Sequence, residues 1–307
     1  MRESACIFAI VVTYNRRTLL ERCIAALQIQ TRLPTRILII DNASSDDTHD
    51  WMLSSGLTEK ELIIYVRMKE NLGGAGGFAE GMKRSFELGA EWIWMMDDDA
   101  VPHHDALEKL LEVAIIENNI YGSLAVNGAD TAWVTTLLEQ GGTVVDRVDL
   151  VPDLSRVKFV PFLGFMAHRN LVGRIGFPNV GFFIAADDVE YCLRAEQAGV
   201  RIFIVGKSQI EHPKSLSYVA QIPGRKLICL ELPPWKRYYD TRNRLLIARK
   251  YYGYRLWTQT VPGSFVRLIA ALIYEPRKFA QLRAFVAGMI DGLLGRIGKR
   301  HTHWGIT

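Results

Sequence analysis

The sequence is poor in cysteine, and its few cysteines lack the spacing of a metal or redox motif. Four cysteines are scattered over 307 residues and none belongs to a Cys-x-x-Cys pair, which argues against a zinc knuckle and against a disulfide framework. Reduced, buried thiols are expected, and they fit a cytoplasmic protein. Internal repeats and low-complexity segments are also missing, and no apolar run approaches the roughly 20 residues of a transmembrane helix. We therefore expect a globular protein without a membrane span.

Charge is unevenly distributed along the chain. The formal net charge is +4, but residues 225–307 contain 16 Lys and Arg against 4 Asp and Glu, whereas residues 1–224 contain 21 against 29. The net charges of +12 and −8 suggest two surfaces with different partners. Two basic amphipathic segments, separated at Pro276, are typical of helices on an anionic membrane surface. Two helices that pack on the body or form an oligomer contact would show the same pattern.

Strand and helix patterns alternate over the first 120 residues. Apolar runs rich in β-branched residues predict buried strands, and stretches with helical spacing follow them. This alternation predicts an α/β fold with a mostly parallel sheet that helices cover on both faces. Later residues indicate a second, mixed-sheet region. Because ligands of such sheets bind beyond the carboxyl ends of the strands, we expect four polar segments to converge there: residues 13–16, 41–42, 71–77 and 97–99.

Three consecutive aspartates, Asp97, Asp98 and Asp99, follow the fourth predicted strand. Oxygen-rich clusters of this kind suit magnesium or manganese, which complete their coordination with substrate phosphates. An acidic cap for the following helix is the alternative. His212 follows a later strand and could complete the coordination of the same ion, although a lone histidine is more often structural.

Two further segments carry candidate nucleotide contacts. Asp41 ends the second predicted strand and is a candidate partner for a base or a ribose, or else a cap for the next turn. The segment NLGGAGG, residues 71–77, has four glycines in five positions and precedes a predicted helix. Glycine lets a backbone approach a ligand closely, and a helix N-terminus favours phosphate. An ordinary loop would look the same.

A second acidic group, with Asp187, Asp188 and Glu190, begins another predicted helix. These residues are helix caps or, beside a metal-diphosphate site, candidates for a general base that deprotonates an acceptor hydroxyl. The segment 235–252 is rich in Arg, Lys and Tyr, as in a solvated helix or a surface for phosphates and sugars. It carries no recognised nucleic-acid motif, so we expect no nucleic-acid partner.

Seven motifs, in this order, resemble those of inverting family 2 glycosyltransferases with the GT-A fold. The resemblance covers about residues 6–250 and is strongest to the galactofuranosyltransferases that initiate arabinogalactan assembly and to related rhamnosyltransferases. It implies a GT-A catalytic domain over residues 1–224, with a donor half (about 1–120) and an acceptor half (121–224), before a basic helical region (225–307) for acceptor and membrane contact. The motifs are FAIVVTYNR, IDN, NLGGAGGFAEGM, WIWMMDDDA, DDVEYCLRAEQAG, EHP and YYDTRNR.

The resemblance implies a role for each matched position. Asp97, Asp99 and His212 would bind the metal, and Asp188 would be the catalytic base. Residues expected to contact the nucleotide or line the donor pocket are Thr13, Arg16, Asp41, Asn71, Gly73, Gly74, Gly77 and Asp98. Residues expected to contact the acceptor are Asp187, Glu190, Arg242 and Asn243.

The expected reaction is metal-dependent transfer of galactofuranose from UDP-galactofuranose, with inversion, to a polyprenyl-diphosphate-linked saccharide. The basic region would hold the enzyme on the inner face of the cell membrane, where a homo-oligomer is also possible. A rhamnosyltransferase that uses dTDP-rhamnose, a non-catalytic sugar-nucleotide-binding subunit and a nucleotidyltransferase are the alternatives. In place of the Trp or Gly often found before the acidic pair, this chain has Ala185 and Ala186, so its sugar contacts there are expected to differ. The long N-terminal domain of the polymerising enzymes is missing, which favours the addition of one or a few sugars.

Overall fold

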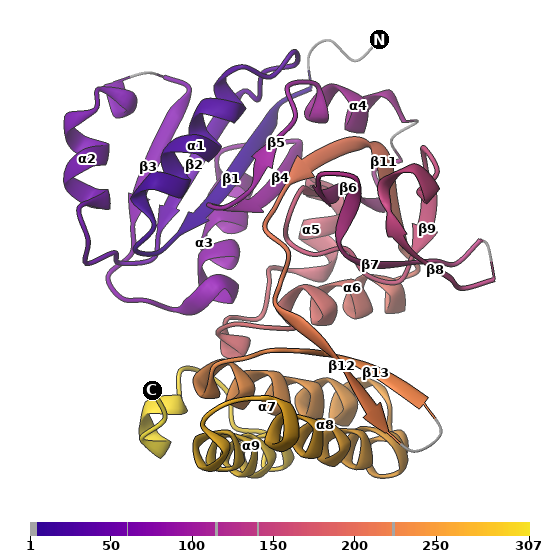
Figure 1. The fold of residues 1–307 in the computed structure, drawn as a ribbon. Coiled ribbons are helices and arrows are strands. Elements are labelled where there is room, and N and C mark those ends of the chain that lie inside the picture. Colours follow the sequence, from indigo (N-terminus) through magenta and orange to yellow (C-terminus); the bar gives the residue numbers. More distant parts are fainter. Residues whose placement is uncertain (1–4, 60, 114–115, 140, 223–224) are drawn as a thin grey trace. The chain divides into compact units, whose positions relative to one another are not determined.

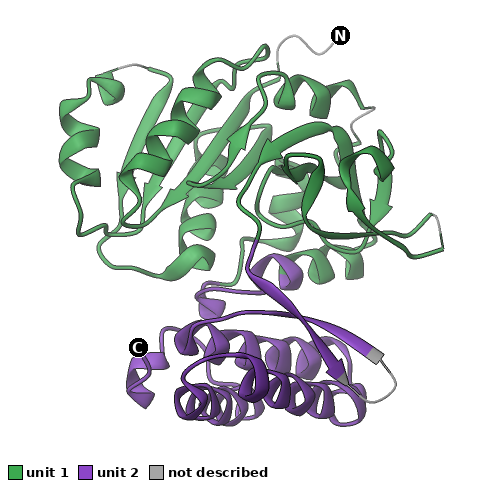
Figure 2. Ribbon diagram, in the orientation of Figure 1, with its two compact units in different colours: residues 1–179, 191–214 green, residues 180–190, 215–307 purple. Residues whose placement is uncertain are grey.

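The computed structural model describes residues 5–59, 61–113, 116–139, 141–222 and 225–307. The chain divides into two compact units (Figure 2). Unit 1 comprises Met1–Asn179 and Tyr191–Lys214, and unit 2 comprises Val180–Glu190 and Ser215–Thr307. The division therefore falls ten residues before the predicted boundary at 224, and a short internal segment belongs with the C-terminal part.

Unit 1 is built on a mixed sheet whose first half is parallel (Figure 1). The order of the parallel strands is β3-β2-β1-β4, and β10 then pairs antiparallel with β4. This arrangement confirms the predicted α/β class and the weaker alternation after residue 120. The first strands are β1 (Ile7–Thr13), β2 (Arg36–Asp41), β3 (Ile63–Arg67), β4 (Trp92–Asp97) and β5 (Val101–Pro102). The others are β6 (Asn119–Asn127), β7 (Asp130–Leu137), β8 (Thr143–Arg147), β9 (Ser155–Val157), β10 (Phe165–His168) and β11 (Arg201–Glu211).

Helices bury both faces of the parallel strands, which explains their continuous apolar sequences. All seven residues of β1 are buried. Phe8, Ile10 and Val12 belong to one hydrophobic cluster, and the alternate residues of β1 belong to another on the opposite face. The helices of this unit are α1 (Arg17–Gln28), α2 (Thr48–Ser54), α3 (Gly73–Glu87), α4 (Ala106–Glu112) and α5 (Arg169–Ile175), with the short helices η1 (Leu57–Glu59) and η2 (Val148–Leu150).

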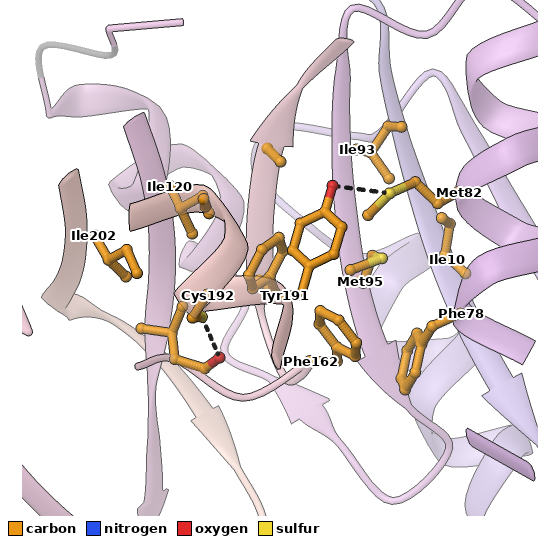
Figure 3. Close-up of a cluster of buried hydrophobic side chains, with 14 of the residues drawn as sticks. Ile10, Phe78, Met82, Ile93, Met95, Ile120, Phe162, Tyr191, Cys192 and Ile202 are labelled. Atoms are coloured by element: carbon orange, nitrogen blue, oxygen red, sulfur yellow. Dashed lines mark hydrogen bonds between the residues drawn. The ribbon is translucent and has the colours of Figure 1, made fainter. Parts of the chain in front are cut away.

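Helix α6 (Asp187–Gln197) begins in unit 2 and continues into the core of unit 1. Tyr191 is fully buried there, and its hydroxyl donates to Gly176 O at 3.0 Å and contacts Met82 Sδ at 3.4 Å. Figure 3 shows this ring beside Phe162, and Cys192 Sγ contacts Val160 O at 3.6 Å. The second half of α6 is therefore held firmly by apolar packing.

Unit 2 is a helical unit with a β-hairpin. Its C-terminal part contains β12 (Ser217–Ile222), β13 (Arg225–Leu230), α7 (Pro234–Tyr251), a π-helix η4 (Leu256–Thr260), α8 (Val261–Tyr274), α9 (Lys278–Leu293) and η5 (His301–Trp304), and its internal segment contains η3 (Val180–Phe182). Helix α9 packs so closely on α7 that two of its glycines leave no room for a side chain. A Cβ atom on Gly288 would lie 2.7 Å from Tyr238 O, and one on Gly292 would lie 2.8 Å from Leu245 Cβ.

Buried polar networks tie the segments of unit 2 together. Asp291 is fully buried and accepts hydrogen bonds from Tyr238 Oη at 2.6 Å and from Arg300 Nε and Trp304 Nε1 at 3.0 Å. The hydrogen bonds and the charge of Arg300 outweigh burial and lower the pKa of Asp291. This network fixes the C-terminal segment to α7 and α9.

One helix corrects the expectation that no segment has the length and apolarity of a membrane span. Within the described residues, Leu256–Tyr274 passes this test by length and composition alone, as the core helix of a soluble protein also can. It includes only one charged residue, Arg267.

Candidate active site

The carboxyl ends of β1 and β4 lie side by side and bring together polar residues predicted to meet. Thr13 Oγ1 donates to Asp98 Oδ2 at 2.8 Å, and both residues are nearly fully buried. Burial raises the pKa of Asp98, although Thr13 and Arg16 partly offset it. Because its hydroxyl is committed to Asp98, we reassign Thr13 from nucleotide contact to positioning of this carboxylate.

Arg16 bridges two of the three aspartates. Its Nη1 lies 3.2 Å from Asp98 Oδ1 and 3.0 Å from Asp99 Oδ2, while about half of its side chain is exposed. A guanidinium in this position can bind an anionic ligand through its exposed side while it keeps its ion pair with at least one of the two carboxylates. Its predicted role as a nucleotide contact fits this placement.

Asp99 also meets His212, which comes from a distant part of the sequence. His212 Nε2 lies 3.3 Å from Asp99 Oδ1, and the rings of Trp133 and His212 make an edge-to-face contact with centroids 5.0 Å apart. Burial favours a higher pKa for Asp99, but the hydrogen bond and charge of His212 and the charge of Arg16 lower it. Asp99 and His212 line a cavity in unit 1 together with Leu19, Arg22, Val101, Asn127, Glu211 and Pro213.

The pair of Asp99 and His212 suits a divalent cation. His212 Nδ1 is buried without a hydrogen-bond partner, and Asp99 Oδ1 is buried against the other ring nitrogen of His212. Carboxylate and imidazole are ligands that manganese accepts. Over the ranges that the structure describes, however, no group of three or more His, Cys, Asp or Glu side chains could hold a metal ion. The predicted set with Asp97 is therefore not assembled, and Asp97 ends β4 in a half-buried position.

Asp41 lies behind the strand ends and not at an open surface. It is fully buried, accepts from Ser44 N at 2.8 Å and from Tyr65 Oη at 2.7 Å, and so orders the turn after β2. Burial together with Asp41 raises the pKa of Tyr65. The predicted contact between Asp41 and the nucleotide is wrong for this arrangement, because no part of the residue is accessible.

The glycine-rich segment divides into residues with different tasks. Asn71 Oδ1 accepts from Gly73 N at 2.8 Å, and Gly73, with φ of +72°, begins α3 directly, so the expected loop is already helical. A Cβ atom on Gly74 would meet nothing within 4 Å, which leaves it available to a ligand. A Cβ atom on Gly77 would overlap Val12 of β1. Gly77 is therefore a packing residue, and its assignment to the donor pocket is corrected.

The second acidic group lies in unit 2, in the first turn of α6. Burial raises the pKa of both Asp187 and Asp188, and the charge of Asp188 raises that of Asp187 further. Glu190 is buried and accepts from Lys250 Nζ at 2.9 Å and from Tyr251 Oη at 2.7 Å. These two partners on α7 were not predicted, although both lie in the basic, tyrosine-rich segment.

Arg242 and Asn243 do not face an acceptor. Both are fully buried, and their donors reach backbone carbonyls of the loop before α6, among them Phe182 O at 2.8 Å from Arg242 and Ala185 O at 2.7 Å from Asn243. The prediction of acceptor contact is wrong for these two residues. Polar side chains with no exposed surface can act only through the backbone that they hold.

Comparison with known proteins shows which family the chain resembles. Residues 8–158 match the model of glycosyl transferase family 2. Galactofuranosyltransferase GlfT1 of Mycolicibacterium smegmatis is 26% identical over 317 residues, with 98% of each chain covered. The dTDP-rhamnosyl transferase RfbF of Shigella flexneri is 22% identical, with 95% of this chain and 97% of that protein covered.

Solved structures show the same fold. A structure of GalNAc-T7 with UDP, GalNAc and Mn²⁺ superposes on 98% of this chain with a TM-score of 0.63 and 11% identity, and this chain spans 58% of that protein. The mannosyltransferase PcManGT of Pyrobaculum calidifontis, in complex with GDP-Man and Mn²⁺, covers 94% of this chain with a TM-score of 0.57 and 15% identity. At these identities the likeness concerns the fold, which is GT-A.

Proposed function

We propose that this chain, which is similar to family 2 glycosyltransferases and has the GT-A fold, transfers galactofuranose from UDP-galactofuranose to a lipid-linked saccharide. The observation that carries the proposal is the junction of Asp98, Asp99, Arg16 and His212 at the strand ends of unit 1. The likeness to GlfT1 along nearly the whole chain supports the sugar.

In this mechanism the Arg16 guanidinium, held by Asp98 and Asp99, contacts the diphosphate of the donor. Asp99 and His212 would hold a divalent cation, which supplies neutralisation of the charge on the leaving diphosphate. Thr13 keeps the Asp98 carboxylate in place through its 2.8 Å hydrogen bond. These residues orient the donor so that its anomeric carbon is open to attack from the face opposite the diphosphate, which inverts configuration.

Asp188 is the proposed general base. Its raised pKa, which results from burial, makes it a stronger base than an ordinary aspartate. It takes the proton of the acceptor hydroxyl as the new glycosidic bond forms and the bond to the diphosphate breaks. UDP and the glycosylated acceptor leave as products.

Turnover of a donor panel tests this function. Purified protein with manganese and a synthetic lipid-linked saccharide is expected to release UDP from UDP-galactofuranose, and a chelator or Asp188→Asn is expected to abolish the release. Asp153→Asn, at a surface ion pair with Lys207, is the matched control and keeps activity. Turnover of dTDP-rhamnose alone would exclude galactofuranose as the transferred sugar. Release of free diphosphate would identify a nucleotidyltransferase, and donor binding without turnover would favour a non-catalytic subunit.

We further propose that unit 2 holds the enzyme on the inner face of the cell membrane, close to a polyprenyl-linked acceptor. The support is a stripe of exposed apolar residues along η4 and α8, with Trp257, Phe265, Ile269 and Ile273 each between 49% and 62% exposed, within a region of net charge +12. Such a helix binds anionic interfaces through apolar burial and electrostatic attraction.

Flotation with vesicles tests the membrane proposal. Binding to anionic vesicles, weaker on neutral ones and lost in a Phe265→Glu, Ile269→Glu double variant, is the expected result. Val144→Glu, at an exposed apolar residue of unit 1, is the control. A stripe that mediates self-association would instead show a concentration-dependent mass that the double variant reduces.

A further inference from the structure

We propose that Arg242 and Asn243 are positioning residues for the catalytic base: they hold the loop Val180–Ala186 in a strained path that fixes where Asp188 projects. The proposal rests on the function proposed above, since it deepens the role of the acidic pair. All of the residues involved belong to unit 2.

The loop before Asp187 has an unfavourable backbone. Phe183, Ala185 and Ala186 have φ values of +64°, +70° and +60°. Side-chain-bearing residues rarely adopt this region, and each such residue costs about 1–3 kcal/mol unless the surroundings hold it. Three in four positions, directly before the acidic pair, require a specific restraint.

Asn243 supplies a restraint at the end of the loop. Its Nδ2 lies 3.1 Å from Phe182 O, 2.8 Å from Ile184 O and 2.7 Å from Ala185 O. Its Oδ1 accepts from Arg242 Nε at 2.8 Å, so the amide nitrogen must face the loop. One side chain therefore fixes the carbonyls that flank the left-handed residues.

Arg242 holds the beginning of the same loop. Its Nη2 donates to Gly181 O at 3.0 Å and to Phe182 O at 2.8 Å, and its guanidinium lies over the Tyr239 ring, 4.7 Å from the centroid. The Tyr239 ring in turn stacks on Phe183 with centroids 4.9 Å apart. Arg242 thus holds the backbone just before Phe183, the first left-handed residue, and Tyr239 holds the side chain of Phe183.

The C-terminal segment closes this arrangement. Gly298 N donates to Gly181 O at 2.7 Å, and Gly298 O accepts from Arg242 Nη1 at 2.6 Å. His301 Nδ1 lies 2.8 Å from Tyr239 Oη. The loop is therefore bound on one side by α7 and on the other by residues near the C-terminus, and its held end continues directly into the turn that carries Asp188.

The decisive variant is Asn243→Ala, compared with Arg244→Gln as a matched control. Arg244 is the next residue on α7, but it pairs with Asp240 of its own helix. Asn243→Ala is expected to lower kcat on the order of 100-fold, the effect of a misplacement of about 1 Å, while KM for the donor and the affinity for UDP stay within twofold. The control is expected to keep both constants.

Two further measurements separate positioning from general stability. Hydrogen exchange of amides 183–190 is expected to accelerate in Asn243→Ala and to stay unchanged in the control. Adding Ala185→Gly and Ala186→Gly to Asn243→Ala removes the backbone penalty, because glycine adopts positive φ freely, and is expected to recover at least tenfold in kcat.

Each remaining outcome has a defined meaning. Unchanged exchange in Asn243→Ala would overturn the restraint itself, whether or not the enzyme is active. Faster exchange with unchanged kcat would show that the restraint serves folding only and would overturn the positioning role. Wild-type protein that turns over no donor would refute the proposed function, and the exchange data would still decide whether the two residues hold the loop.

Discussion

Replacing single glycines of α3 by alanine is expected to have opposite effects at positions only three residues apart. At Gly77 an added Cβ overlaps Val12 Cγ1 and lies 3.2 Å from Cγ2 and 3.4 Å from Cβ of the same valine. Rotation about χ1 of Val12 cannot clear the contact, because both methyl groups are too close and the residue is β-branched. We expect a packing cost near 3 kcal/mol, the upper part of the range of about 1–3 kcal/mol for overpacked cores.

The helix preference of alanine offsets part of this cost. Gly→Ala within a helix gains about 1 kcal/mol, so Gly77→Ala is expected to destabilise unit 1 by about 2 kcal/mol. Gly74→Ala meets nothing within 4 Å and is expected to gain at most about 1 kcal/mol. With about 2–4 °C per kcal/mol for domains of this size, the Tm of Gly77→Ala falls by about 4–8 °C.

Thermal unfolding followed by tryptophan fluorescence, to which the buried Trp92 and Trp94 of unit 1 contribute, measures this difference. The affinity for UDP, measured on the folded proteins, is the second quantity compared. Gly77→Ala is expected to lose stability and keep UDP affinity, whereas Gly74→Ala, at a position predicted to line the donor pocket, is expected to gain up to about 1 kcal/mol of stability and to lose affinity. A Gly77→Ala protein with the Tm of the wild type would refute the packing argument.

Three other predictions concern the site and unit 2. Because burial raises the pKa of Asp188, the base is lost as the pH falls through this raised value, so the acid limb of kcat should lie well above pH 4; a limb at the ordinary aspartate value would contradict the assignment. Glu275→Ala leaves Arg237, whose side chain is 4% exposed, without its carboxylate and should cost about 3–5 kcal/mol in a urea titration. The double variant Arg237→Met, Glu275→Leu should recover most of that loss, and no recovery would speak against the ion pair as the cause. Thr13→Val removes the donor to buried Asp98 and should cost about 1–3 kcal/mol of stability, measured by the same titration, and a neutral result would show that Asp98 finds another partner.

The parallel half of the sheet was predictable because its signals are local. Buried strands such as β1 and β4 are continuous apolar runs, and polar residues follow directly where the strands end. Parallel strands bring such ends to one edge, so the meeting of Thr13 with the aspartates follows from the pattern. His212 was a candidate ligand because it follows a strand, and the family resemblance supported its pairing with Asp99, since over 100 residues separate the two.

Other features depend on tertiary contacts that no local pattern reports. A glycine that lets α3 approach β1, such as Gly77, looks in sequence like one that lines a phosphate loop. Arg242 and Asn243 lie in a polar helix whose sequence is typical of a solvated surface, and their burial depends on a loop that precedes them by about 60 residues. The same distant contact explains why residues 180–190 belong to unit 2.

The loop before Asp188 precedes in the sequence the residues that hold it, and this order has a consequence during synthesis on the ribosome. The loop that leads to Asp188 needs Arg242 and Asn243, and its closing contact needs Gly298, which lies 117 residues after Gly181. At about 5–20 residues per second, Gly298 follows the loop by roughly 6–23 s. All residues of unit 1, including His212, are added before Gly298, so a nascent chain can assemble its donor side while the loop before the base still waits for this contact.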